Sequence, residues 1–352
     1  MLTISEAILH SDLGRIPKDC LIGICGELNL DQTGAANLLI DRILNAAERS
    51  QALEKHSNRL FCGKTSVTWF HLSSGASLLG AKGKIISKSD FNPFEELRVP
   101  PQEELSATPK LIAAIQGDNQ HSYYLRFMYK ARTENYYYGL QKMAAPISDV
   151  VTVYIDEENQ YIEVRSGGVN AKKVAAKVAD LISQSITLEQ TSLIPNATNL
   201  DAFAESLGGS VIETVGRPEG TINKLSPEEA ASVCNILNAV DNYFNNQDTA
   251  ELVREIEAAR VVLGDCCPIS QIVLAGLDRV GLGCETDLRR GNPLYDLLKP
   301  HVQQQTGYIK FEYPNTKALH TIRVGLTTNS IQFMTHATEN VIKYVRDRVI
   351  II

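Results

Sequence analysis

The segment YLRFMY, residues 124–129, and the segment YIKFEY, residues 308–313, share one order of aromatic, aliphatic and basic residues. Side chains that alternate in this way predict a β-strand in each case. The residues that follow the two segments are also alike, so the segments mark an internal repeat. Such a repeat decides the architecture of a chain more than any single motif does.

Each copy of the repeat continues with two more expected strands and a closing amphipathic helix. A short polar turn separates the second and third strands of both copies. The chain is therefore predicted to be an α+β protein whose body uses a β-β-β-α unit twice. A true duplication and the shared patterning of short β-β-α units both explain the match. The expected strands are 124–129, 151–155 and 161–165 before a helix at 170–183, and 308–313, 321–326 and 331–334 before a helix around 341–347.

The composition is that of an ordinary globular protein. Of the 352 residues, 44% are hydrophobic and 21% are charged, so the chain can bury a core, and its length predicts two or three domains. No apolar run approaches the roughly 18 residues that a membrane span needs. The first residues lack the basic start and apolar core of a signal peptide. We therefore expect a cytoplasmic protein with no membrane partner.

The seven cysteines are odd in number and irregular in spacing, which argues against a disulfide framework. None of them forms the paired CxxC spacing with nearby histidines that is typical of a zinc site. We expect reduced thiols in the core, and neither a metal site nor a cofactor.

The negative charge is concentrated in the middle of the chain. The net charge is −7, and residues 187–280 contain 14 acidic and 5 basic residues. A segment this acidic repels a nucleic-acid backbone, whereas the two repeat regions remain candidate surfaces for one.

The first 72 residues have the element order of a winged helix. Three short helices are expected, the first with a capping box at Thr3 and Glu6, followed by β-rich residues 65–72. In a winged-helix-like domain the third helix, with Arg42 and Arg49, and the hairpin, with Lys64, would face DNA. The alternative is a small helical domain that binds a protein partner or packs on the sheet.

Four further regions complete the predicted organisation. Glycine and proline in residues 73–109 predict a solvated linker, with a flexible basic arm that follows phosphates as the alternative. A short helix at 110–116 opens the first sheet unit, 110–186. The acidic insert, 187–305, is expected to be mainly helical, and the second sheet unit is 306–352. Within the insert, helices are expected at 226–244, from 249, at 268–280 and at 293–304.

Tyrosines and basic residues alternate through residues 121–142 against a single acid, Glu134. Strand alternation places Leu125 and Phe127 on one face and the basic residues on the opposite one, which we expect to be exposed. Aromatic rings that stack on bases and cations that neutralise phosphates are typical of nucleic-acid readers. A half-exposed sheet face covered by the helical insert is the alternative. The candidate nucleic-acid contacts in this segment are Tyr124, Arg126, Lys130, Arg132 and Tyr136.

Catalytic motifs are scarce in this sequence. It contains no Walker A loop, Rossmann glycine fingerprint, GxSxG or HExxH. Asp156 with Glu163 and Arg165 resembles the acid pair of a nuclease, with arginine where such a site has lysine. A polar turn explains the same residues without chemistry.

These observations leave three hypotheses for function. The leading one is a non-enzymatic protein that binds nucleic acid, most readily DNA, with low sequence specificity. The second is an assembly or regulatory adaptor that binds other proteins or its own copies through the sheet face and the acidic helices. The third is an enzyme whose site is assembled from scattered residues, and it predicts a deep polar pocket with shifted pKa values.

Overall fold

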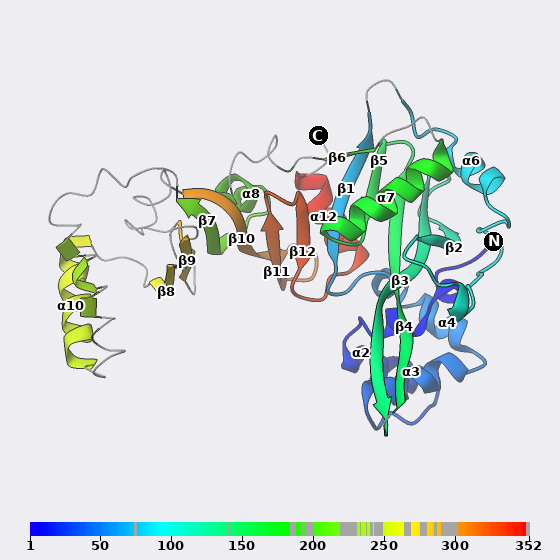
Figure 1. Cartoon of the computed structure of the whole chain (residues 1–352), viewed down its shortest axis with the longest axis horizontal. Helices are drawn as coiled ribbons and strands as arrows, with labels where there is room; N and C mark the ends of the chain where they lie inside the picture. The colour runs from blue at the N-terminus through cyan, green and yellow to red at the C-terminus, as the bar shows by residue number, and fades with distance from the viewer. Residues whose placement is uncertain are drawn as a thin grey trace. The chain divides into compact units, whose positions relative to one another are not determined.

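The computed structural model divides the chain into two compact units (Figure 1). Unit 1 contains Met1–Leu193 and Thr328–Ile352, and unit 2 contains Ile194–Thr327. Both combine helices with antiparallel strands, as expected for the α+β class. The structure describes residues 1–73, 76–139, 141–183, 188–191, 193, 200–218, 231–232, 234–236, 238–239, 242, 249–263, 269–274, 280–284, 287–289 and 302–349.

Unit 1 is built on an antiparallel sheet with the strand order β2-β3-β4-β5-β1-β12, and β6 pairs with β1. The strands are β1 (Ser66–Leu72), β2 (Lys110–Gln116), β3 (Ser122–Tyr138), β4 (Gln141–Asp156), β5 (Tyr161–Val164), β6 (Leu188–Gln190) and β12 (Ser330–Phe333). The helices are η1 (Ser5–Ala7), α1 (His10–Leu13), α2 (Lys18–Glu27), α3 (Ala36–Asn45), α4 (Arg49–Glu54), α5 (Ser57–Leu60), α6 (Ala81–Lys88), η2 (Gln102–Glu104), α7 (Gly168–Ile182) and α12 (Glu339–Val349).

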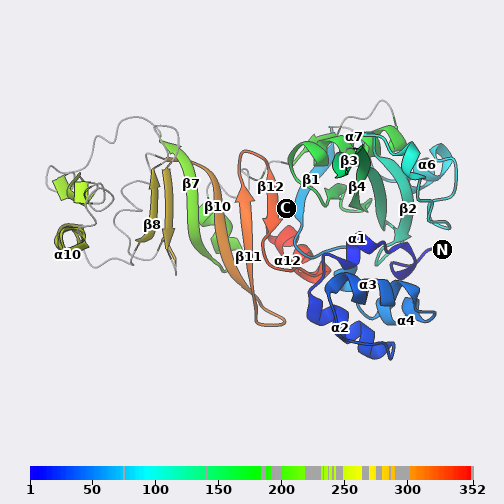
Figure 2. The ribbon, with the colours of Figure 1, turned by 60° about the horizontal axis from the view of Figure 1, so that its bottom comes forward.

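Helices cover both faces of this sheet (Figure 2). Helices α6 and α7 lie on one face, and the N-terminal helices with α12 lie on the other. Buried residues of α7 recur at helical spacing, from Ala171 through Val174 and Val178 to Ile182. They pack on strand residues such as Phe127, which forms part of the same apolar core. Both faces of the strands are therefore inside the protein over most of the sheet.

Unit 2 contains a second antiparallel sheet path, β11-β10-β7-β9-β8. Its elements are α8 (Leu200–Ser206), β7 (Ser210–Pro218), α10 (Thr249–Leu263), β8 (Ile269–Leu274), β9 (Val280–Cys284), β10 (Val302–Tyr313) and β11 (Ala318–Gly325). The expected helix from residue 249 is confirmed by α10. The expected helix at 268–280 is wrong, because β8 and β9 occupy this region. The helices expected at 226–244 and 293–304 lie largely outside the described residues, and 302–304 already belong to β10.

The repeat has the expected element order in both copies, β3-β4-β5-α7 and β10-β11-β12-α12. Whether the copies arose by duplication remains a prediction. The division into units passes through the second copy, because β10 and β11 belong to unit 2 while β12 and α12 belong to unit 1.

The helix expected at 110–116 is wrong, because these residues form strand β2 and pair with β3. The run Ile112–Ile115 is buried on both faces of the sheet. A continuous apolar run of this length fits a buried strand as well as a helix, and its pairing with β3 decides between them.

Residues 73–109, expected to be a solvated linker, contribute to the core instead. Leu78, Ala81, Ile85 and Phe94 are buried in the apolar core of the sheet. Strand β1, which was expected in the wing, lies between β5 and β12 in the interior of the sheet. The described residues of the N-terminal region therefore form short helices packed on this sheet.

Candidate functional site

Strands β3 and β4 form a long hairpin that extends well beyond the ends of the neighbouring strands (Figure 1). We divide it into two parts. The hairpin base consists of residues 122–129 and 149–156, and the distal ribbon consists of residues 130–148. Lys130 pairs with Ser148 at their boundary, and Tyr137 pairs with Lys142 near the tip.

The hairpin base is buried on both faces. Arg126 is 0% exposed, and its guanidinium donates to Asp12 Oδ2 and, over 2.6 Å, to Thr152 Oγ1. Its carbon Cζ lies 4.4 Å from the centre of the Phe61 ring. Tyr124 is also buried, and its ring lies 5.0 Å from that of Tyr154. The prediction of an exposed basic face is therefore wrong for Tyr124 and Arg126, because the N-terminal helices cover this face.

The distal ribbon keeps its other predicted contacts at the surface. Arg132 and Tyr136 are exposed, and Lys130 is half-buried. Sequence reasoning did not select Tyr137, which is 71% exposed, or Lys142, which is also exposed. Both were visible in the same aromatic and basic stretch.

A β-bulge between Lys130 and Arg132 sets which side chains share a face of the ribbon. Because cross-strand partners share a face, Lys130, Tyr137 and Lys142 lie on one side. Arg132 lies on the opposite side together with Glu134. One side therefore presents two cations and an aromatic ring without an acid.

The candidate contacts of the N-terminal region lie on elements separate from the ribbon. Arg42, on α3, forms an ion pair with Asp31 at 2.8 Å and also donates to the Asp31 carbonyl. Arg49, at the start of α4, donates to the Leu44 carbonyl. Lys64 is exposed just before β1. The two arginines thus hold local loops of the helical region together.

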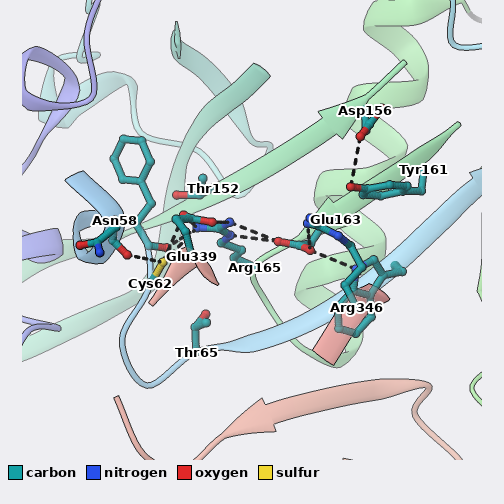
Figure 3. A network of polar contacts seen from close by, with 12 residues as sticks. Asn58, Cys62, Thr65, Thr152, Asp156, Tyr161, Glu163, Arg165, Glu339 and Arg346 are labelled. Carbon is teal, nitrogen blue, oxygen red and sulfur yellow. Dashed lines mark hydrogen bonds and ion pairs between the residues drawn. The ribbon is translucent and has the colours of Figure 1, made fainter. Parts of the chain in front are cut away.

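A buried network of charges connects β5 with α12 (Figure 3). Glu163 accepts hydrogen bonds from Arg165 and, over 3.0 Å, from Arg346 Nη1. Arg165 Nη2 donates to Glu339 Oε2 at 2.6 Å. Two carboxylates and two guanidinium groups therefore alternate along one chain of ion pairs. Trp69 Nε1 also donates to Glu163, and Cys62 Sγ to Glu339.

The arrangement of Asp156 does not favour a nuclease site. Its carboxylate accepts from the backbone amides of Glu158 and Asn159 at 3.0 and 2.9 Å, and from the Tyr161 hydroxyl. It thus closes the turn between β4 and β5, while Glu163 is occupied by the ion-pair network. Among the described residues there is no group of three or more side chains able to hold a metal ion.

The pKa shifts in the network stabilise its charged forms. Burial would raise the pKa of the Glu339 carboxyl, but Arg165, the Cys62 hydrogen bond and the charge of Arg346 together outweigh burial and lower it. Burial would lower the pKa of Arg346, but Glu163 raises it. A general acid or base works best with a pKa near the ambient pH. These groups are instead locked in their charged forms, which suits a structural role.

A scan against protein-family models and a search of the curated proteins both returned no match. None of the helices in the described part of the chain is both long enough and apolar enough to span a bilayer.

Proposed function

We propose that this protein binds nucleic acid with low sequence specificity through the distal ribbon. The supporting observation is the charge of this exposed part of the hairpin. Between residues 130 and 148 there are three basic side chains, Lys130, Arg132 and Lys142, against the single acid Glu134.

The chemistry of these side chains suits a phosphate backbone. Lysine and arginine neutralise phosphates irrespective of sequence, and exposed tyrosine rings stack on bases of any kind. Tyr137 lies on the same side of the ribbon as Lys130 and Lys142. A two-stranded ribbon is also narrow enough to enter the major groove of B-form DNA.

A protein partner for the same ribbon is the second candidate. Tyr136 and Met143 pair across the strands and are 48% and 43% exposed. Exposed aromatic and methionine side chains are enriched at protein interfaces. Binding of this kind would depend on apolar contact and would respond weakly to salt.

A mobility-shift titration at two salt concentrations tests the proposal. Labelled duplex and single-stranded DNA should bind at low salt, and the affinity should fall steeply as salt rises. The triple variant Lys130→Gln, Arg132→Gln, Lys142→Gln should reduce the slope of log K against log salt by up to about 2.7, at about 0.9 per phosphate contact.

The matched control removes three exposed charges elsewhere in unit 1, by Lys18→Gln, Lys84→Gln and Lys172→Gln. It should retain the wild-type slope. The proposal fails if neither DNA binds at low salt, or if both triple variants lose affinity equally. Self-association that is insensitive to salt and lost in Tyr136→Ser would favour the second candidate.

A further inference from the structure

Unit 1 contains a cleft of about 480 Å³ beside the N-terminal half of α12. Sites for small molecules typically measure about 300–1,000 Å³. Its buried wall includes Ile115, Tyr124 and Tyr154, which are at most 8% exposed. Residues 1–4, Glu54 at the end of α4, α5 and the loop after β2 complete its lining.

Helix α12 turns one polar side toward this cleft. Glu339, Lys343 and Arg346 all line it, and their spacing of four and three residues places them on one face of the helix. Lys343 is exposed, whereas Arg346 is 6% exposed. The helix thus presents one cation at the mouth and one in the buried wall.

The acids near the buried wall are already occupied by other groups. Glu339 is held by Arg165 and Cys62, and Glu163 by Arg165 and Trp69 as well as by Arg346. The remaining acids of the lining, Glu54 and Asp118, are exposed.

Arg346 retains donors that this network does not use. A guanidinium carries five N–H donors. Within the described residues Arg346 makes one side-chain hydrogen bond, from Nη1 to Glu163; its Nε is buried and without a hydrogen-bond partner, and its Nη2 makes no hydrogen bond. The Nε lies 3.6 Å from Asp347 Oδ1, and Cζ lies 5.2 and 5.0 Å from the ring centres of Tyr154 and Tyr161. Nη2 is therefore the nitrogen of this guanidinium with capacity for a further acceptor.

We propose that this cleft binds a small organic anion whose carboxylate or phosphate group contacts Arg346 and Lys343. The rest of the molecule lies against Tyr124 and Tyr154. A bound water takes up about 30 Å³, so the cleft holds far more than a bare inorganic ion. This site is formed by residues outside the distal ribbon and does not depend on the proposed nucleic-acid binding.

Isothermal titration calorimetry with the full chain tests the site, using adenosine 5′-monophosphate, citrate and inorganic phosphate as probes. At least one of the two organic anions should bind more tightly than inorganic phosphate. Lys343→Gln should weaken that binding about tenfold, the size typical of a lost charge-assisted hydrogen bond. Arg346→Lys should weaken it further, because lysine lacks the planar fork of donors.

Lys343 is the decisive position because it is exposed, whereas Arg346 also supports the fold. Lys172→Gln removes an exposed charge on α7, on the opposite face of the sheet (Figure 2), and should bind like the wild type. The triple ribbon variant should also bind like the wild type, which separates this site from the ribbon. The proposal is overturned if no probe binds at millimolar concentration, or if Lys343→Gln and Lys172→Gln bind equally.

Discussion

The hairpin base and the distal ribbon belong to the same two strands and both contain tyrosine and basic residues, yet they offer opposite environments to their cations. In the base, Arg126 is fully buried and bonded to Asp12 and Thr152. In the ribbon, Arg132 is exposed, and Lys142 is exposed near the tip.

This difference shows that the basic and aromatic residues of a strand reach the surface only where no other element covers the strand. The alternation of side chains is set locally, by the strand itself. Coverage is set by distant parts of the chain, since Asp12 lies 114 residues before Arg126. Removing a cation from the base or from the ribbon tests this difference in environment.

The largest expected effect is on the buried half. Arg126→Ala leaves the Asp12 carboxylate buried without its cation, and losing one partner of a buried ion pair costs about 3–5 kcal/mol. Arg132→Ala, the matched change in the ribbon, should alter the free energy of unfolding by less than about 0.5 kcal/mol. Urea unfolding of both variants measures the difference.

A double-mutant cycle with Asp12→Ala identifies the cause of this loss. The two substitutions should be strongly non-additive, because each removes the same ion pair. Additive losses would show that Arg126 stabilises the fold by packing against Phe61 instead.

Amide hydrogen exchange should show the same contrast without any substitution. Residues buried on both faces exchange only through large openings, whereas an exposed ribbon opens locally at little cost. We expect amides of 130–138 and 141–148 to exchange about 100-fold faster, or more, than those of the base. Equal protection in the two halves would mean that the ribbon is covered in solution, as it would be by a second copy.

The sequence predicted the base of the hairpin but neither its length nor its surroundings. Strands were expected at 124–129 and 151–155, whereas β3 and β4 span Ser122–Tyr138 and Gln141–Asp156. The strand segments of the base, the turn at Asp156 and the buried stripe of α7 depend on residues close together in the chain, so periodicity revealed them. The ion-pair network depends on contacts such as Arg165 with Glu339, which are 174 residues apart. No local pattern encodes that distance.

The two errors in the strand assignments have a related cause. Residues 110–116 and 269–274 contain apolar runs without clear alternation, and only their pairing partners make them strands. For the proposed site, sequence pattern found Lys130, Arg132 and Tyr136 in the ribbon. It could not reveal that Tyr124 and Arg126 are covered.

Acid should lower the free energy of unfolding by protonating Glu339 in the buried ion-pair network. Because the pKa of this carboxyl is lowered on folding from its ordinary value of 4.5, its contribution is fully present above that pH. The contribution is lost as the pH falls through the lower, folded pKa. Glu339→Gln should lower the unfolding free energy at pH 7 by about 1.5–3 kcal/mol. The unfolding free energy of this variant should then fall less steeply than that of the wild type as the pH is lowered.

Glu134→Gln is the control for this pH dependence, because Glu134 is exposed in the ribbon. Its unfolding free energy should follow the wild type from pH 7 to pH 3. If Glu339→Gln also follows the wild type, the carboxylate contributes no net stability to the buried network.

The smallest expected change in stability is at Tyr137, where a substitution should weaken DNA binding and leave the fold intact. This ring is 71% exposed, so Tyr137→Ala should change the unfolding free energy by less than about 0.5 kcal/mol. A ring that stacks on a base contributes about 1–3 kcal/mol, so single-stranded DNA binding should weaken at least about fivefold. Tyr137→Phe keeps the ring and should retain the affinity. If Tyr137→Ala binds DNA like the wild type, any contact of the ribbon with nucleic acid relies on its cations alone.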